Sequence, residues 1–296
     1  MKNHTQKRTT IMKKAVLLFS LALLASCGNQ TKKEAVSTSE THGHEHPHPH
    51  SLDENGLAPH TENTIHQYAP TVALLNSIYE GDITPEQMVQ QGNIGIGTVN
   101  HLAGELVAVD GVVYTIDAEG GIKVAPQDLE SPNMTMINFQ PKRTVTVENI
   151  ESYEDLTKAL QKYATSINSF YAYRIKGEFG YLKMASAHKV ENEDVSLFEY
   201  LDTRVMYTRE NIKGTLVGLF TPDYLGNIVI PGMHFHFLSE DIKLGGHLED
   251  IKFDKLQVEI QEVNQVNLQL PETEKFRTRE LKQGAAPKAT AKQNGK

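Results

Sequence analysis

The segment Pro231-Gly-Met-His-Phe-His-Phe-Leu238 alternates imidazoles with large apolar side chains, a pattern typical of a β-strand with two different faces. Side chains two residues apart on a strand share a face, so His234 and His236 project together while the methionine and phenylalanines beside them pack on the other side. A polar, glycine-ended turn at 239–245 follows, and His247 opens the next strand. We therefore expect a β-hairpin that returns His247 to the first two histidines.

Three histidines brought together in this way favour a metal site. Three protein ligands with an open fourth position are a common catalytic arrangement, especially for zinc (Zn2+). Neutral imidazoles also suit copper, iron and nickel, so the ligand type leaves the ion open. The alternative is that His234, His236 and His247 are separate core histidines with their own hydrogen bonds. The H-x-H spacing followed by a hairpin return favours the metal site.

The sequence around this hairpin predicts an α+β fold of mostly antiparallel strands with a few helices. Asp110-Gly111 is a strong turn signal between two apolar runs. Thr84 and Pro85 resemble an N-cap and a first helical residue. Helices are expected at 72–79, from Thr84 onward and at 153–163; hairpins at 106–116 and at 170–184, the second turning at Lys176-Gly177; and strands near 134–139, 144–147, 214–220, 228–238, 246–253 and 263–270.

The predicted helices and strands divide the folded region into an N-terminal α+β domain at 64–165 and a C-terminal β-rich domain at 166–281, which carries the metal-binding hairpin. The basic, Ala/Gln/Gly-rich segment 282–296 is expected to be a disordered tail.

The first 27 residues have the pattern of a bacterial lipoprotein signal peptide. Lys13 and Lys14 precede an apolar run at 15–25, which is too short for a membrane span of about 20 residues. The run ends in Leu24-Ala-Ser-Cys27-Gly28, which resembles a lipobox with Cys27 as the acylated residue. The expected product is a lipid-anchored protein, periplasmic or on the cell surface. An ordinary secretory signal with an incidental cysteine is the alternative.

Residues 28–63 are polar and include Thr41-His-Gly-His-Glu-His-Pro-His-Pro-His50. Alternating histidines and prolines cannot build a core, so this segment is expected to be a disordered His-rich tether. It is either a spacer with incidental metal affinity or a segment that gathers metal for the folded region.

The overall composition excludes two classes of function. Of 296 residues, 29 are Lys or Arg and 37 are Asp or Glu, giving a formal net charge of −8, whereas a nucleic-acid binder normally presents a basic surface. The one cysteine, Cys27, forms no intrachain disulfide and lies in the leader rather than in a site for cysteine catalysis.

The chain resembles the α-acetolactate decarboxylase family from about Ile65 to Phe276. Several motifs in one order carry the resemblance: Tyr79-Glu-Gly-Asp82, Gly95-Ile-Gly-Thr-Val-Asn100, Gly104-Glu105, Phe170-Tyr-Ala-Tyr-Arg-Ile175, Lys213-Gly-Thr-Leu-Val-Gly218, Thr221-Pro-Asp-Tyr224, His234-Phe-His-Phe-Leu238 and Gly245-Gly-His247. The resemblance implies a zinc enzyme that removes CO2 from 2-acetolactate to give acetoin. It also implies two β-rich domains with the metal site on the β-hairpin between them, and commonly a homodimer.

The resemblance also implies roles for individual residues. His234, His236 and His247 match the zinc ligands of the family. Glu105 matches a glutamate near the metal that handles protons, and Thr98 matches a threonine that lines the substrate pocket. From its neighbours alone, Glu105 would be interpreted as a solvated hairpin carboxylate.

Two family groups lack a match. Ala185 stands where the family has an active-site arginine, and Arg174 matches a different family arginine. No acidic residue follows Glu280, and neither it nor the earlier Glu272 and Glu274 aligns with the family's C-terminal glutamate. Either residues such as Lys183 or His188 take the place of the missing groups, or the activity is weak or altered.

These observations lead to a lipid-anchored acetolactate decarboxylase as the first hypothesis. The rival is a metal-binding lipoprotein relative with lost or altered lyase activity. A third hypothesis is another metal-dependent lyase or hydrolase acting on a related small acid. Under the first hypothesis, the expected partners of the chain are 2-acetolactate, the membrane through Cys27 and a second copy of the chain.

Overall fold

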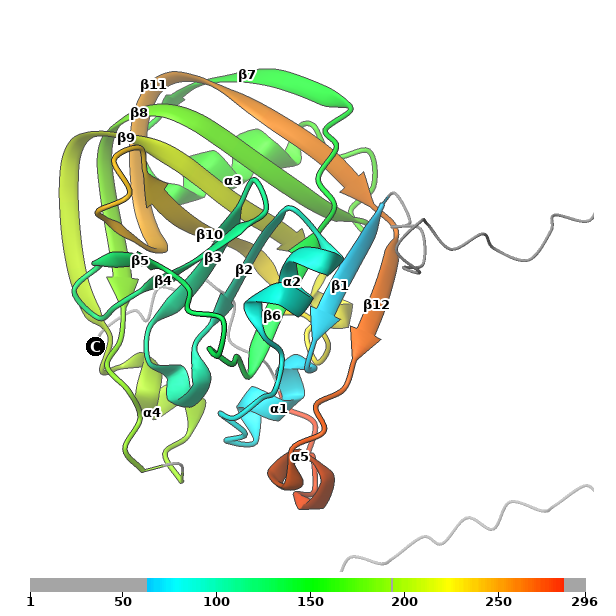
Figure 1. Ribbon diagram of the computed structural model, residues 1–296. Helices are drawn as coiled ribbons and strands as arrows, with labels where there is room; N and C mark the ends of the chain where they lie inside the picture. The colour runs from blue at the N-terminus through cyan, green and yellow to red at the C-terminus, as the bar shows by residue number, and fades with distance from the viewer. Residues whose placement is uncertain (1–62, 193, 285–296) are drawn as a thin grey trace, which may run out of the picture. The chain divides into compact units, whose positions relative to one another are not determined.

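The computed structural model describes residues 63–192 and 194–284 (Figure 1). The expected signal peptide, with Cys27, and the His-rich tether up to residue 62 lie outside the described residues, as does the tail from 285.

A seven-stranded sheet carries most of the N-terminal half. All its pairings are antiparallel except that between β1 and β12, which lie side by side in Figure 1. β12 comes from near the C-terminus, so the two ends of the described chain share one sheet edge. The strand order is β12 (Gln265–Gln269), β1 (Thr64–Tyr68), β6 (Asn133–Ile137), β2 (Ile94–Thr98), β3 (Glu105–Val109), β4 (Val112–Ile116) and β5 (Ile122–Val124).

A five-stranded antiparallel sheet carries most of the C-terminal half. Its order is β10 (Gly232–Ser239), β9 (Val205–Thr221), β8 (Phe170–Ser186), β11 (Gly245–Val263) and β7 (Arg143–Ile150). β10 also pairs with the start of β11, so four of these strands form a closed ring of pairings. This closure brings the histidine strand and the start of β11 together.

The helices are short, and all but α5 lie between strands along the described chain. Thr84 caps α2 as predicted: its backbone N–H donates to Oε1 of Gln87 at 2.9 Å. Ser152 caps α3 by accepting from the N–H of Asp155 at 3.1 Å. The helices are α1 (Thr71–Leu75), α2 (Pro85–Gln91), α3 (Tyr153–Gln161), α4 (Leu197–Leu201) and α5 (Glu274–Thr278), with 3-10 turns at Asn100–Leu102 and Asp223–Leu225.

Two apolar cores meet at β10 and divide its faces. Phe235 and Phe237 belong to a core that β8, β11 and α3 also fill. Leu238, on the opposite face, belongs to a second core shared with the seven-stranded sheet. Val217 and Leu219 of that second core lie opposite His236 and His234 on β9, so the histidines face the other sheet. This arrangement confirms the α+β class and the histidine site between two β-rich layers.

The structure corrects the expected hairpin turn at Lys176-Gly177. Phe170–Ser186 is one continuous strand, and Gly177 pairs with Gly214 in its middle. A Cβ at Gly177 would lie 2.2 Å from Cδ2 of Leu256, so close packing rather than a turn explains this glycine. The hairpin at 106–116 is confirmed, with Asp110 and Gly111 both at positive φ.

The expected helix at 72–79 is shorter than predicted. It ends at Leu75, because the chain turns at Ser77 with a positive φ of 54°. The domain boundary at 165/166 stays a prediction; across it, β7 joins the second sheet and β12 joins the first. Within the described ranges, every helix is too short or too polar to cross a bilayer.

Candidate metal centre

The three histidines are brought together by the β10–β11 hairpin. His236 and His247 are directly opposed partners in the antiparallel pairing, and His234 is two residues before His236 on the same face. The turn between the strands is held by Ser239, whose Oγ accepts from the N–H groups of Lys243 and Leu244 at 3.1 and 3.0 Å. The predicted hairpin return is therefore confirmed.

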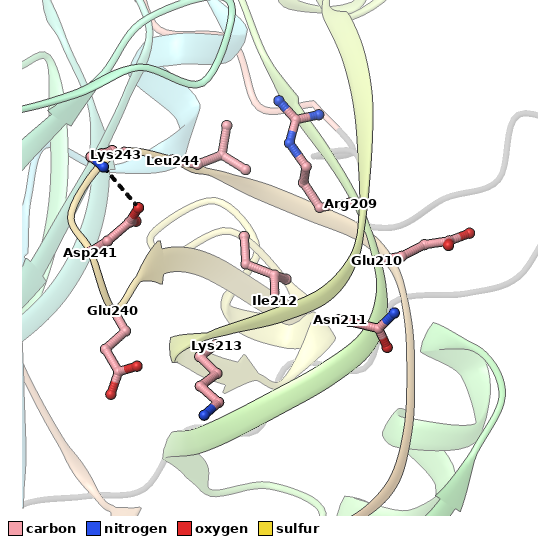
Figure 2. A pocket seen from close by; sticks show the side chains of 9 residues that line it. All are labelled: Arg209, Glu210, Asn211, Ile212, Lys213, Glu240, Asp241, Lys243 and Leu244. Atoms are coloured by element: carbon pink, nitrogen blue, oxygen red, sulfur yellow. Dashed lines mark ion pairs between the residues drawn. The ribbon is translucent and has the colours of Figure 1, made fainter.

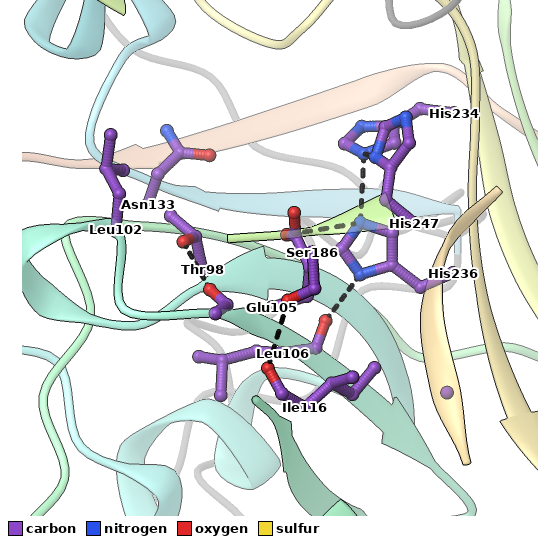
Figure 3. Close-up of polar contacts among 12 residues, drawn as sticks. Thr98, Leu102, Glu105, Leu106, Ile116, Asn133, Ser186, His234, His236 and His247 are labelled. Carbon is purple, nitrogen blue, oxygen red and sulfur yellow. Dashed lines mark hydrogen bonds and ion pairs between the residues drawn. The ribbon is translucent and has the colours of Figure 1, made fainter. Parts of the chain in front are cut away.

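Their ring nitrogens form a compact group (Figure 3). Nε2 of His234 lies 3.1 Å from Nε2 of His236 and 3.2 Å from Nδ1 of His247. One ligand atom from each ring lies within 4.8 Å of the other two. The residues are 9%, 0% and 7% exposed in chain order, so water hardly reaches the cluster.

The charge state of the rings suits metal binding. Burial lowers the pKa of His236 to about 4, against a hydrogen bond to Leu106 that raises it. Burial, followed by the neighbouring His247 and His236 and the charge of Arg204, holds the pKa of His234 well below its usual range. Both imidazoles are therefore neutral at pH 7, which is the form that ligates metals.

A backbone contact from the other sheet orients His236. Its Nδ1 lies 2.7 Å from the carbonyl oxygen of Leu106 and donates to it. The proton on Nδ1 leaves the lone pair of Nε2 directed at His234 and His247. A ring anchored through its second nitrogen is the usual state of a metal-ligating histidine. The three nitrogen donors thus fit a metal ion.

Glu105 lies beside the cluster at the start of β3. Its Oε2 is 3.7 Å from Nε2 of His236, and its side chain is 13% exposed. Burial raises the pKa of Glu105 to about 7, while Arg204 lowers it and Glu249 raises it. This carboxyl can hold a proton near neutral pH, unlike the solvated carboxylate that its sequence neighbours indicate.

Thr98 is the cross-strand partner of Glu105 in the β2–β3 pairing. Its Oγ1 donates to the carbonyl oxygen of Gly104 at 2.7 Å. Gly104 has a φ of +101°, and a Cβ there would lie 2.2 Å from the carbonyl oxygen of Ile116. Thr98 and Gly104 together fix the bend from which Glu105 enters the site.

The structure also places the residues considered for the missing arginine. Ala185 is fully buried and is the direct β-sheet partner of His247. His188 is 69% exposed and pairs with Glu119 at 3.3 Å, so it is not part of the cluster. Arg174 pairs with Glu259 at 2.6 Å and with Asp110 at 2.8 Å.

The acidic residues near the C-terminus do not join the cluster in the described part of the chain. Glu272, Glu274 and Glu280 are exposed. Glu272 pairs with Arg277 at 3.3 Å, and Glu274 begins the exposed helix α5.

Sequence reasoning missed two residues at the site, Arg204 and Glu249. Nη1 of Arg204 lies 2.6 Å from Oε1 of Glu249, and the same oxygen lies 3.8 Å from Nε2 of His247. The H-x-E spacing of His247 and Glu249 could have indicated a shared face. Arg204 is 43 residues before His247 along the chain and stands in no motif, so only the fold brings it there.

A second candidate, a hollow outside the histidine cluster, is lined mainly by charged and polar side chains (Figure 2). It has a volume of about 490 Å³ and is lined by Arg209, Glu210, Asn211, Ile212, Lys213, Glu240, Asp241, Lys243 and Leu244. Its Lys243–Asp241 ion pair, at 3.5 Å, joins two largely exposed side chains. Mixed, solvated charges of this kind suit a protein surface, so the histidine cluster is the candidate site.

Comparisons with known proteins show the family of this chain. The family model described as alpha-acetolactate decarboxylase matches residues 65–283. The chain is 33% identical to an alpha-acetolactate decarboxylase of Brevibacillus brevis over 225 residues, covering 76% of this chain and 79% of the relative. It is 32% identical to one from Bacillus subtilis over 212 residues, covering 72% and 83%.

Solved structures show the same fold. The crystal structure of alpha-acetolactate decarboxylase from Bacillus subtilis strain 168 superposes with a TM-score of 0.71 at 31% identity, covering 74% of this chain and 94% of that one. A Staphylococcus aureus protein of unknown function, described as similar to alpha-acetolactate decarboxylase, also gives 0.71, at 25% identity and 74% and 95% coverage.

Proposed function

The chain belongs to the alpha-acetolactate decarboxylase family and is a carboxy-lyase; on this premise we propose that it converts 2-acetolactate to acetoin and CO2 with a metal ion held by His234, His236 and His247. The observation that carries this proposal is the buried cluster of three imidazoles, two of which, His234 and His236, are neutral at pH 7, next to a carboxyl group that can hold a proton.

Zinc is the ion that we propose. Three imidazoles leave a coordination position open, as is typical of catalytic zinc. A bound metal ion would supply Lewis-acid stabilisation of the negative charge that develops on the substrate oxygens as CO2 leaves. The fixed Nδ1–H of His236 supports this use, because it commits the other ring nitrogen to the metal side.

The protein residues would then manage the proton. Loss of CO2 leaves an electron pair on carbon, and one proton must be delivered there to give acetoin. Glu105 is suited to deliver it, because burial raises its pKa to about 7 and its Oε2 lies beside His236. Thr98, hydrogen-bonded to Gly104 next to Glu105, would line the pocket and hold this strand end in place.

Formation of acetoin by the purified full-length chain, loaded with zinc and given racemic 2-acetolactate, tests this proposal. Metal-dependent acetoin is the expected result. Its absence from a folded, metal-loaded chain would favour the second candidate, a metal-binding relative with lost or altered lyase activity. The observation behind that candidate is Ala185, which stands where the family resemblance implies an arginine.

We further propose that lipid on Cys27 anchors the protein to a bacterial membrane, in the periplasm or on the cell surface. The charged start, the apolar run and the Leu24-Ala-Ser-Cys27 site support this. Cys27→Ser is expected to move the protein from the membrane fraction to the soluble one. A variant that still pellets with membranes after a high-salt wash would contradict the anchor. We also propose that two copies of the chain form a homodimer, as the family resemblance implies.

A further inference from the structure

Arg204 is a nearly buried cation held at the edge of the histidine cluster. Its side chain is 14% exposed, and that of its partner Glu249 is 18% exposed. Nε of Arg204 donates to the carbonyl oxygen of Leu201 at 3.2 Å, and Nη1 donates to Oε1 of Glu249 at 2.6 Å. That oxygen also faces His247, so one carboxylate oxygen connects the guanidinium to the cluster.

The sheet register explains why Arg204 can reach this place. Ala185 on β8 is opposed by Met206 on β9 and by His247 on β11, so these three residues share a face. Arg204 directly precedes β9, two residues before Met206, and its ion pair with Glu249 shows that its side chain reaches the side of His247.

The guanidinium keeps donor capacity for a ligand. Within the described ranges, the hydrogen bonds of Arg204 use Nε and Nη1, and Nη2 makes none. An arginine has five N–H groups in a planar fork that matches a carboxylate. A group fixed on one side with donors unused on the other is prepared to bind an anion.

The positive charge of Arg204 lies beside the carboxylate of Glu249 at the edge of the cluster. Its Nη1 is 2.6 Å from Oε1 of Glu249, and that oxygen is 3.8 Å from Nε2 of His247. An anionic substrate that approaches Glu249 needs such a positive charge to offset the repulsion.

We propose that Arg204 binds the carboxylate of the substrate, and that Glu249 is the positioning residue that holds its guanidinium. This inference rests on the proposed function, because 2-acetolactate carries the carboxylate that Arg204 would take. It assigns the cation role to neither Lys183 nor His188. Lys183 lies two residues from Ala185, farther from His247, and His188 is largely exposed.

The test measures the binding of two small probes to the zinc-loaded full-length chain by calorimetry. 2-Hydroxyisobutyrate carries a carboxylate and a hydroxyl group. 3-Hydroxy-3-methylbutan-2-one is 2-acetolactate with a methyl group in place of the carboxylate. Arg204→Gln should weaken the first probe about ten- to a hundredfold, as expected for a lost charge-assisted pair, and leave the second within about twofold. KM for 2-acetolactate should rise in the same proportion.

Matched variants separate this role from a structural ion pair. Arg209→Gln removes an exposed arginine of β9, five residues after Arg204. Within the described residues Arg209 bonds only to the carbonyl oxygen of Thr208, so this variant should leave both probes unchanged. Glu249→Gln keeps an oxygen that can accept from Arg204 and should weaken the carboxylate probe less than Arg204→Gln does. Melting temperature and zinc content identify any variant that fails to fold, and Arg204→Lys, which keeps the charge, then serves as the second variant.

Unchanged binding of 2-hydroxyisobutyrate to folded Arg204→Gln would overturn the inference, as would equal losses for both probes. Failure of zinc-loaded wild-type protein to bind the carboxylate probe would overturn it as well. Probe binding without acetoin formation would instead contradict the proposed function, and the comparison of wild type with Arg204→Gln would still decide the role of Arg204.

Discussion

His236 and His247 are directly opposed across the β10–β11 pair, and a different group lies behind each ring. The carbonyl oxygen of Leu106, from the other sheet, accepts from His236 at 2.7 Å. Glu249 faces His247 at 3.8 Å from the same strand. The centre therefore depends on the packing of the two sheets as well as on the hairpin.

His247→Ala should release the metal. Removing one of three imidazoles leaves two donors, so zinc affinity should fall by more than the 10- to 100-fold typical of lost outer contacts. Elemental analysis of the purified protein checks this. His188→Ala is the control, because that histidine is 69% exposed and outside the cluster. Full zinc occupancy in His247→Ala would reject the three-histidine centre.

Glu105→Gln should separate proton transfer from metal binding. The amide keeps the shape of the side chain but holds no transferable proton, so kcat should fall about 10²- to 10⁴-fold while zinc stays bound. Acetoin formation under saturating substrate, with zinc content measured alongside, provides the test. An unchanged kcat would remove Glu105 from the reaction.

The same variant should change the pH dependence of stability in the metal-free protein. Burial raises the pKa of Glu105 from 4.5 to about 7, so between these values the folded state keeps a proton that the unfolded chain loses. The contribution of this group to the free energy of unfolding therefore falls as pH rises through that window. The melting temperature of Glu105→Gln should rise relative to that of the wild type between pH 4.5 and 7. A constant difference would contradict the buried carboxyl.

Gly218→Ala should loosen the support under the histidines. A Cβ there would lie 2.0 Å from Cδ1 of Phe235, which packs on the reverse face of β10. Overpacking of this kind costs about 1–3 kcal/mol. Gly180→Ala is the control, since its nearest contact would be 3.6 Å from the carbonyl oxygen of Lys252. Denaturant unfolding should find a loss for Gly218→Ala alone; equal stabilities would contradict the close approach.

Ala185→Arg should rescue Arg204→Gln. Position 185 opposes His247, so a guanidinium there can reach the space that the variant vacates. The double variant should regain about tenfold of the lost affinity for 2-hydroxyisobutyrate. Lys183→Ala in the wild type should leave that affinity unchanged. No regain in a folded, zinc-containing double variant would show that the two positions do not share a ligand.

The sequence was sufficient where chemistry and geometry are local. The H-x-H spacing and the polar turn predicted the cluster because a strand fixes which side chains share a face. Gly177 was misinterpreted because a glycine pressed against Leu256 and a glycine in a turn look alike in sequence. Only the family resemblance predicted Glu105 as a site residue, because its burial depends on strands far apart in the chain. Arg204 was missed because only tertiary packing brings it to Glu249, which faces His247.

The most direct test is a zinc titration of the metal-free full-length chain with acetoin as the readout. Acetoin formation from 2-acetolactate should rise with added zinc until each chain holds a single ion and then stay constant. His236→Ala should form none at the same zinc concentrations. Acetoin formation that does not depend on zinc, or that is equal in His236→Ala, would contradict the histidine centre as the site of the reaction.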